Sequence, residues 1–203
     1  MKILLIFGAG GHGRVAADAA LETALWSRVL ATDRNPDRCH GELLTGVAVL
    51  PMAEALALAD AVHVAIGDAA GREREASALG TKPLATVIHP RASVSAHAVL
   101  GPGCLVAAHA VVAAGARLGQ SVIVNHAAVV DHDVRVGDFS HIAPLVALGG
   151  AVHIGARVLV GSGATILPGV RVADDVVIGA GAVVSSDLTE PGRYAGVPAR
   201  RIP

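Results

Sequence analysis

The sequence predicts a small α/β domain followed by a parallel β-helix, and two observations carry that prediction. From Val94 to Val184 a branched aliphatic residue, always Val, Ile or Leu, recurs at every sixth position. The first 85 residues lack this period and alternate short apolar runs with helical stretches, with a glycine-rich segment after the first run. Hexapeptide repeats are typical of β-helices. Alternating strands and helices are typical of a parallel sheet that carries helices on its faces.

Each hexad is expected to form one flat β-face and one corner, so that three hexads close a triangular coil. The aliphatic side chain points inward, stacks on its counterpart one coil away, and leaves the backbone to bond with the neighbouring coil. Small residues fit the narrow interior near a corner, and glycine is expected at corners that need unusual backbone angles. The composition agrees, because the chain is 53% hydrophobic but only 2% aromatic. A β-sandwich of many short strands is the alternative, but it would not require equal spacings.

The N-terminal segment is expected to form a Rossmann-like half domain. The expected strands span residues 2–7, 28–31 and 62–66, and the expected helices span residues 14–25, 51–59 and 69–79. Charges of alternating sign mark the last helix. Ligands of parallel sheets bind at the carboxyl ends of the strands. The turn at residues 8–13, the pair Thr32 and Asp33, and Gly67 each follow a strand, so they are expected around one crevice.

The turn at residues 8–13 matches the G-x-G-x-x-G pattern of dinucleotide sites, and Asp33 lies twenty residues beyond Gly13. Such a turn lets a phosphate approach a helix N-terminus, where free N–H groups and the helix dipole favour anions. The domain has only half the length of a full dinucleotide-binding fold, so a mononucleotide or a nucleotide sugar is favoured. A tight strand-to-helix turn without a ligand is the alternative.

Charge and composition exclude several classes of partner. The net charge is −1, from 16 basic and 17 acidic residues, and no basic stripe indicates nucleic-acid binding. The apolar stretches carry the hexad period and are interrupted by Gly, Asp and His, so no membrane span is expected. The first seven residues run straight into the glycine turn and indicate a strand rather than a signal peptide. Cys39 and Cys104 suggest no disulfide framework, which fits a reducing cytoplasm.

The densest polar interruption of the coil lies between residues 125 and 133. Its polar side chains must lie on corners or outer faces, because the aliphatic positions hold the interior. The imidazole of His132 in its neutral form could accept a proton from a reacting group of a substrate. A neighbouring carboxylate, Asp131 or Asp133, could hold the tautomer and raise the basicity of the ring.

The hexads match the [LIV]-[GAED]-x-x-[STAV]-x pattern, and over roughly residues 88–203 the chain resembles the left-handed β-helix acyltransferases. The left hand of the coil is taken from that resemblance. A glycine-loop domain followed by an uninterrupted coil is similar, more narrowly, to bacterial sugar acetyltransferases. These include the enzymes that N-acetylate nucleotide-linked 4-amino sugars in the bacillosamine and perosamine pathways, and the related sialic acid O-acetyltransferases. The resemblance implies a nucleotide-sugar domain over residues 1–85 and an acyltransferase domain over residues 86–203.

The resemblance also implies roles for particular residues of the N-terminal domain. In the N-acetylating enzymes a G-x-G-H-G turn, an acidic residue after the second strand and a glycine after the third strand bind the nucleotide sugar. The implied substrate contacts in this chain are Gly10, Gly11, His12, Thr32, Asp33 and Gly67.

In the coil, the family carries a [DE]-H-[DE] motif and, nine residues after its histidine, another histidine in F-S-H. This chain has D-H-D at residues 131–133 and F-S-H at residues 139–141, with the same spacing. The match implies His132 as the general base, Asp133 as the partner that raises its basicity, and His141 as a contact of acetyl-coenzyme A. The further contacts implied for coenzyme A are Gly150, Ser162 and Ala180.

These observations predict an enzyme that moves an acetyl group from acetyl-coenzyme A to the amine of a nucleotide-linked amino sugar. O-acetylation of a sialic acid or another sugar is the rival, because a hydroxyl needs the same base. The second class is a structural or metal-binding coil of the carbonic-anhydrase type. A metal would need three convergent imidazoles, and His126, His132 and His141 lie on different faces of one chain. No metal is therefore expected.

Two expectations concern the assembled protein. The apolar flat faces of the coil, and a site that draws residues from two chains, predict a homotrimer. The segment after residue 190 breaks the hexad period and resembles the tail that covers the last coil in the family, as the open end of a solenoid requires. Arg193, Arg200 and Arg201 in this segment are expected to be solvated, and the alternative is that they reach the phosphates of coenzyme A.

Overall fold

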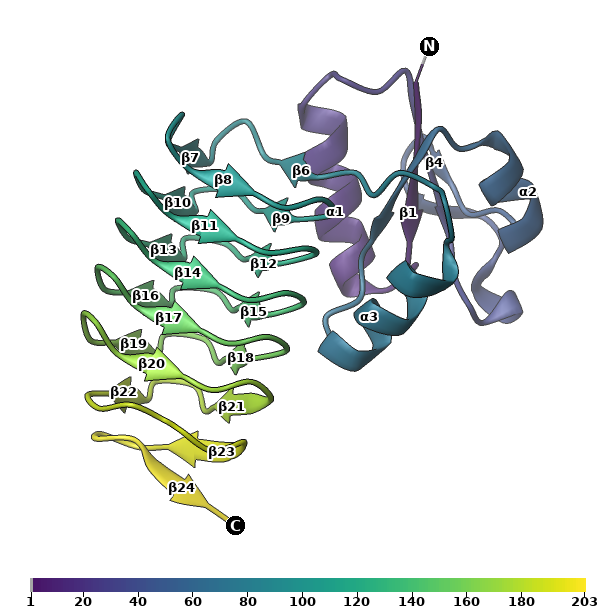
Figure 1. Ribbon diagram of the computed structural model, residues 1–203. Coiled ribbons are helices and arrows are strands. Elements are labelled where there is room, and N and C mark those ends of the chain that lie inside the picture. The colour runs from purple at the N-terminus through teal and green to yellow at the C-terminus, as the bar shows by residue number, and fades with distance from the viewer. Residues whose placement is uncertain (1) are drawn as a thin grey trace. The chain divides into compact units, whose positions relative to one another are not determined.

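The computed structural model describes residues 2–203, and the chain divides into two compact units, Met1–Pro90 and Arg91–Pro203 (Figure 1). The N-terminal unit is built on a three-stranded parallel sheet in the order β2-β1-β5. These strands are β1 (Ile3–Phe7), β2 (Arg28–Thr32) and β5 (Ala61–Val64). Phe7 pairs with Thr32 on one side and with Val64 on the other, so the carboxyl ends of the three strands are level.

Helices surround this sheet. They are α1 (Gly11–Glu22), α2 (Met52–Leu58) and α3 (Ala69–Ala78). Shorter elements are a 3₁₀ turn (Pro36–Arg38), the hairpin strands β3 (Glu42–Leu44) and β4 (Val47–Ala48), and β6 (Val87–Ile88). A core cluster of apolar side chains between the sheet and α2 comprises Leu5, Phe7, Leu30, Ala55, Ala59 and Val62. The sheet therefore gains its stability from the near-continuous apolar runs that predicted its strands.

The first helix begins at Gly11 rather than at Arg14, where the sequence predicted its start. The N–H of Arg14 donates to the carbonyl oxygen of Gly10 at 3.1 Å, so the last glycines of the turn already belong to the first helical turn. At Gly13 a side chain would overlap the carbonyl oxygen of Gly8, and only glycine lets the helix pack this closely on the turn. The hairpin of β3 and β4 was not predicted, because strands this short carry little pattern.

The C-terminal unit is a parallel β-helix with three faces, and most of its strands are two residues long. The first face, as we call it, is the sheet of β7 (Ser93–Val94), β10 (Val111–Val112), β13 (Val129–Val130), β16 (Ala147–Leu148), β19 (Thr165–Ile166) and β22 (Val183–Val184). The second face is β8 (Val99–Leu100), β11 (Arg117–Leu118), β14 (Arg135–Val136), β17 (His153–Ile154) and β20 (Arg171–Val172). The third face is β9 (Leu105–Val106), β12 (Ile123–Val124), β15 (His141–Ile142), β18 (Leu159–Val160) and β21 (Val176–Ile178).

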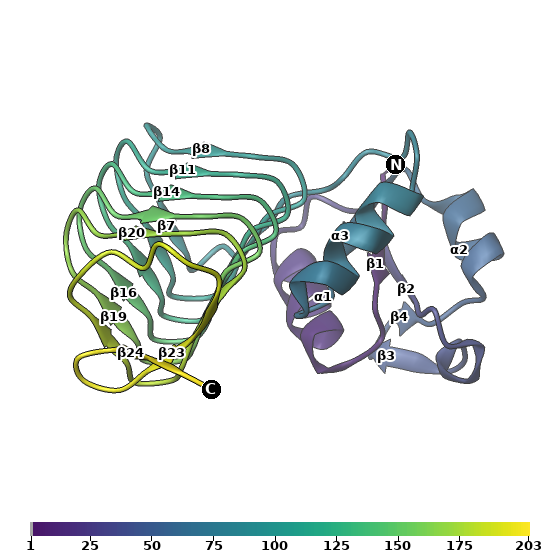
Figure 2. The ribbon, with the colours of Figure 1, turned by 60° about the horizontal axis from the view of Figure 1, so that its bottom comes forward.

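Strands that are neighbours within a face come from successive coils. Val112 pairs with Val130 on the first face, for example, and Val124 pairs with Ile142 on the third. The inward ladder positions are almost all buried, and Val124, Val130 and Ile142 have no exposed surface. The predicted period of the aliphatic residues therefore corresponds to the three inner walls of the coil, which Figure 2 shows as nested turns.

Glycines beside the aliphatic positions serve a purpose other than the one expected. A Cβ at Gly137 would lie 2.6 Å from the backbone nitrogen of Ala156 in the next coil, so close approach of the backbone excludes a side chain there. The left-handed backbone angles fall later in each corner, and several are held by other residues, including Ala127 (φ 54°) and Asp133 (φ 60°). Spacing between coils, more than backbone angle, thus explains the glycine after the aliphatic.

The last coil is covered by β23 (Gly192–Ala195) and β24 (Arg200–Ile202), which pair antiparallel. Tyr194 pairs with Ile178 and is largely buried, so the chain end closes the apolar interior as expected of a cap. None of the helices in residues 2–203 has the length and apolar character that crossing a bilayer requires.

Candidate active site

His132 and Asp133 occupy the corner that leads from the first face to the second, which we call the first corner. The Nδ1 atom of His132 lies 2.9 Å from Oδ2 of Asp133. A carboxylate can only accept, so Nδ1 carries the proton and the lone pair of the neutral ring is on Nε2. The backbone N–H of His132 donates to Oδ1 of Asp131 at 2.7 Å and holds the corner in place. The pair thus presents a base with a defined tautomer.

Electrostatics increase the basicity of this imidazole. The hydrogen bond that His132 donates to Asp133 raises the pKa of the imidazole above its ordinary value of 6.5, and the charge of Asp131 adds to the effect. The side chains of His132 and Asp133 are 62% and 69% exposed, so the ring remains accessible to a substrate.

Gly150 lies one coil beyond His132 on the first corner and provides the space that the ring occupies. A Cβ at Gly150 would lie 2.5 Å from Nε2 and 2.6 Å from Cε1 of His132. Any side chain there would displace the imidazole, so glycine permits the ring to rest over the next coil.

His141 lies on β15, in the third face, and contacts Asn125, a residue for which the sequence analysis predicted no role. Its Nε2 atom lies 3.1 Å from Nδ2 of Asn125, a residue of the preceding coil. The Oδ1 atom of Asn125 accepts the backbone N–H of His126 at 2.8 Å. Asn125 therefore orients the His141 ring and anchors the corner at His126. Its position in the polar interruption of the coil was the only signal in the sequence.

Ser162 and Ala180 lie on the corner that leads from the third face to the first, which we call the third corner. They are exposed and stacked, with the N–H of Gly181 donating to the carbonyl oxygen of Ser162 at 2.9 Å. His126 is on this corner too. The coil residues proposed from the sequence thus form two groups on either side of the first face, and a single chain does not bring them together.

In the N-terminal unit, Asp33 anchors the glycine turn. Its Oδ2 atom accepts the N–H of Ala9 and its Oδ1 atom accepts the N–H of Asn35, both at 2.9 Å. A Cβ at Gly10 or Gly11 would meet nothing within 4 Å, so the outer side of the turn is open. The carboxyl end of β2 and the glycine turn therefore form one edge of the sheet, as expected.

The remaining predicted residues of this unit differ in exposure. Thr32 has no exposed surface, and its hydroxyl donates to the carbonyl oxygen of Leu50 at 2.9 Å, so it braces β2. His12 is half-buried in the first turn of α1. Gly67 follows β5 and has open space beside its Cα.

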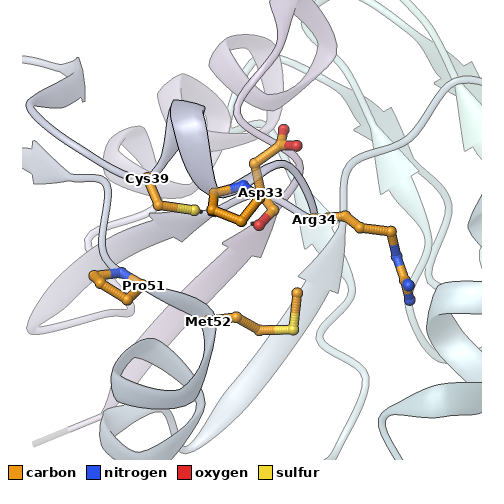
Figure 3. Close-up of a pocket in the computed structure, with 6 residues that line it drawn as sticks. Asp33, Arg34, Cys39, Pro51 and Met52 are labelled. Atoms are coloured by element: carbon orange, nitrogen blue, oxygen red, sulfur yellow. Dashed lines mark hydrogen bonds between the residues drawn. The ribbon is translucent and has the colours of Figure 1, made fainter.

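A pocket of about 240 Å³ opens beside Asp33 (Figure 3). The residues that line it with Asp33 are Arg34, Pro36, Cys39, Pro51 and Met52. The thiol of Cys39 donates to the carbonyl oxygen of Asp33 at 3.3 Å, and this bond draws the loop after β2 around the pocket. Apolar carbon, two sulfur atoms and two charged groups meet here. The sequence did not predict this pocket, because three separate segments of the loop and of α2 build it.

Residues 2–203 contain no group of three His, Cys, Asp or Glu side chains that could hold a metal ion. The arrangement of the histidines explains this result, because His126, His132 and His141 come from two corners and one face of the coil.

Comparison with known proteins agrees with this architecture. Residues 3–79 match the PglD N-terminal domain, and residues 151–186 match the bacterial transferase hexapeptide (six repeats). No curated protein matches the chain.

Several solved structures are similar over the full chain. The acetyltransferase domain of PglB from Neisseria gonorrhoeae FA1090 is 36% identical, with 100% of both chains covered and a TM-score of 0.91. The same domain in complex with acetyl coenzyme A is 37% identical, with 99% of both chains covered and a TM-score of 0.91. The third is GDP-perosamine N-acetyl transferase from Caulobacter crescentus, a mutant in which one histidine is replaced by alanine, in complex with CoA and GDP-perosamine. It is 34% identical, with 100% of this chain and 98% of that chain covered and a TM-score of 0.91.

These similarities extend over both units and confirm the predicted fold class, an α/β half domain followed by a left-handed β-helix. The chain belongs to the hexapeptide-repeat sugar N-acetyltransferases.

Proposed function

We propose that this enzyme transfers the acetyl group of acetyl-coenzyme A to the amine of a nucleotide-linked amino sugar, with His132 as the general base. The observation that carries the proposal is the geometry of His132, whose proton is held on Nδ1 by Asp133 while Nε2 lies over Gly150. Similar structures hold acetyl coenzyme A in one case and CoA with GDP-perosamine in another. That pairing of ligands favours N-acetylation over O-acetylation of a sialic acid.

A single base, His132, is sufficient for both proton transfers of the reaction. Nε2 of His132 takes a proton from the sugar amine as its nitrogen attacks the thioester carbonyl. The tetrahedral intermediate collapses, the C–S bond breaks, and the coenzyme A sulfur leaves and takes the proton back from the imidazolium. The products are the N-acetyl sugar, the free thiol of coenzyme A and the neutral imidazole. Asp133 stabilises the imidazolium between the two proton transfers.

We further propose that the active enzyme is a homotrimer whose sites lie between neighbouring chains. The first corner carries His132 and Gly150. Ser162 and Ala180 lie on the third corner and His141 lies on the third face, so these three residues are on the other side of the first face. The third face and third corner of one chain would meet the first corner of the next, so that acetyl-coenzyme A contacts both groups.

The outward residues of the faces support this arrangement. The first face carries no charged side chain outward, since its outward positions are Ser93, Val111, Val129, Ala147, Thr165 and Val183. The outward positions of the second face are Val99, Arg117, Arg135, His153 and Arg171. Burial of unpaired charge is costly, so the first face is suited to an interface and the second face to solvent.

For the nucleotide sugar we propose the edge of the N-terminal sheet. Gly10, Gly11 and His12 would receive its phosphates at the start of α1, where helix N–H groups favour anions. Asp33 and Gly67 would contact it from the ends of the neighbouring strands. Thr32 would act through its bond to Leu50 rather than by touching the ligand.

The neighbouring pocket has room and apolar lining for a nucleobase. We also propose a cytoplasmic location, which the use of acetyl-coenzyme A and the free thiols of Cys39 and Cys104 support.

A thiol-release assay tests the proposed reaction. Acetyl-coenzyme A would be offered with a panel of uridine, guanosine and cytidine nucleotide amino sugars, and with free sialic acid. Turnover is expected with a nucleotide amino sugar, with an acetamide as product by mass spectrometry. Turnover with sialic acid alone would favour O-acetylation, and no turnover on any amine would refute the proposal.

A further inference from the structure

Arg72, on α3, is the largest side chain in residues 2–203 that is fully buried, with 0% exposed surface. A buried guanidinium must be paired or hydrogen-bonded, because desolvation of an unpaired charge is costly. Its Nη1 atom donates to the carbonyl oxygen of Ile66 at 2.6 Å and to that of Gly67 at 3.0 Å. Both carbonyls belong to the segment that joins β5 to α3, so Arg72 holds this segment from the inside.

The two bonds determine where the adjoining N–H groups point. The carbonyl of Ile66 and the N–H of Gly67 belong to one planar trans peptide and point in opposite directions. The carbonyl of Gly67 and the N–H of Asp68 are related in the same way. Because Arg72 draws both oxygens inward, both N–H groups turn away from the buried guanidinium. Neither N–H forms a hydrogen bond within residues 2–203.

These two donors lie at the edge of the sheet that carries the glycine turn. A Cβ at Gly8 would lie 2.7 Å from the carbonyl oxygen of Ala65 and 3.5 Å from Cγ1 of Ile66, so the turn and the end of β5 are in direct contact. Asp33 bonds to the next residue of the same turn. The segment that carries the N–H groups of Gly67 and Asp68 therefore lies beside the glycine turn, at the edge of the sheet where Asp33 also lies.

Helix α3 also contacts the segment that follows the carboxyl end of β2. Glu75 lies one turn after Arg72, is 2% exposed, and its Oε2 atom lies 2.6 Å from Nη2 of Arg34. Arg34 follows Asp33 and lines the pocket beside it. The hydrogen bond to Glu75 raises the pKa of Arg34 further and holds this guanidinium, which is always a cation, beside the pocket. One buried face of α3 thus holds the ends of both β5 and β2.

We infer that Arg72 is a positioning residue of the nucleotide-sugar site, which aims the N–H groups of Gly67 and Asp68 at acceptor oxygens of the nucleotide. The inference rests on the proposed function of this domain. Substrate affinity then depends on a side chain that does not touch the substrate.

Kinetics of Arg72→Met and Arg72→Lys test the inference in the full-length enzyme. Arg72→Met is expected to raise KM for the nucleotide amino sugar at least about tenfold, since hydrogen bonds to charged acceptors are among the stronger ones. It should leave KM for acetyl-coenzyme A and kcat within about twofold. Arg72→Lys keeps the charge and part of the donor capacity, so it should restore part of the affinity. An unchanged KM for the nucleotide sugar in a folded Arg72→Met enzyme would overturn the inference.

Arg74→Gln is the matched control, because Arg74 lies on the same helix and its side chain is 65% exposed beside Glu75. It should change neither KM by more than about twofold. A rise equal to that of Arg72→Met would mean that the charge of α3, and not the two carbonyls, governs binding, and would overturn the inference.

Hydrogen exchange of the unmodified enzyme provides a second measurement if the variants do not fold. Saturating nucleotide amino sugar is expected to protect the amides of Gly67 and Asp68, and coenzyme A alone is expected to leave them unprotected. No protection by the nucleotide sugar would overturn the inference. An enzyme that acetylates no nucleotide amino sugar would instead refute the proposed function, so the two failures are distinguishable.

Discussion

The hydrogen bond between His132 and Asp133 joins neighbouring residues, yet it depends on the shape of the corner. Asp133 has a left-handed backbone conformation (φ 60°), which turns its carboxylate back toward the imidazole. The same carboxylate approaches the position where a Cβ of Gly115 would lie, 2.6 Å from Oδ1. Small residues in the adjoining coils therefore make room for His132 and Asp133 on both sides.

Replacement of His132 by alanine should remove the general base. We expect kcat to fall at least about a hundredfold, within the range for loss of a positioned acid–base group. Steady-state thiol release measures the effect, with the melting temperature as a check of folding. A loss of less than threefold would remove His132 from this role.

Asp133→Asn should change the pH dependence of the reaction. The neutral imidazole is the active form, so kcat/KM falls when the pH drops through the pKa of His132. Asp133 raises that pKa, and its removal should therefore move the acid limb of the profile to lower pH. The plateau should also fall by about tenfold or more, because the imidazolium loses its charge partner. An acid limb that stays in place would show that Asp133 does not set the basicity.

Gly150→Ala tests the space that the imidazole needs. A methyl group there would lie 2.5 Å from Nε2 of His132, so the ring must move. We expect a loss in kcat of about tenfold or more, as misplacement of a catalytic group by an ångström costs up to a hundredfold. Little change in the melting temperature is expected, since His132 is exposed. Full activity in the variant would contradict the geometry.

At the scale of single elements, β5 combines stability with site geometry. His63 lies in this strand with 1% exposure, and its Nδ1 is 3.0 Å from the carbonyl oxygen of Ala85. Burial lowers its pKa from 6.5 to about 4. The folded state therefore resists protonation of the ring, while the unfolded chain binds a proton below pH 6.5. After the end of β5, the buried Arg72 donates to the carbonyl oxygens of Ile66 and Gly67 and fixes the backbone that leads to α3.

This linkage predicts acid sensitivity of the N-terminal unit. Stability should be full above pH 6.5 and fall as the pH drops from 6.5 to 4, by about 3 kcal/mol in total. Trp26 is the only tryptophan of the chain and lies in this unit, so its fluorescence reports the unfolding. His63→Gln should flatten the dependence in this pH window. An equally steep dependence in the variant would assign the effect to other groups.

At the scale of the whole molecule, the distribution of charge over the coil separates an apolar face from a basic one. Val129 lies outward on the first face with 37% exposure, and Val99 lies outward on the second face with 51% exposure. Val129→Arg should dissociate the proposed trimer and abolish activity, because the interface cannot pair the buried charge. Multi-angle light scattering measures the mass of the assembly.

Val99→Arg is the matched control for Val129→Arg. It makes the same substitution on the face that already carries Arg117 and Arg135, and should leave both mass and turnover unchanged. A native enzyme with the mass of one chain would contradict the shared site.

Much of this protein was predictable from local pattern. The hexads specify the coil because each contact repeats the one before it, and the inward ladders follow from the period alone. The hydrogen-bonded pair of His132 and Asp133 was predictable because its members are adjacent, and the glycine turn because it joins a strand to a helix. The boundaries of α1 and the hairpin of β3 and β4 were not predictable, since short elements depend on their neighbours.

Tertiary structure decided whatever joins distant parts of the chain. Asp33 meets the glycine turn across 24 residues, and Asn125 meets His141 across 16. The alternating charges of α3 did not reveal which of its side chains are buried, and the fold buries Arg72 and Glu75, which lie three residues apart on one helical face. A period shows which residues point inward, but a buried charge is stable only where the fold supplies its partners, and those partners are set by packing in three dimensions.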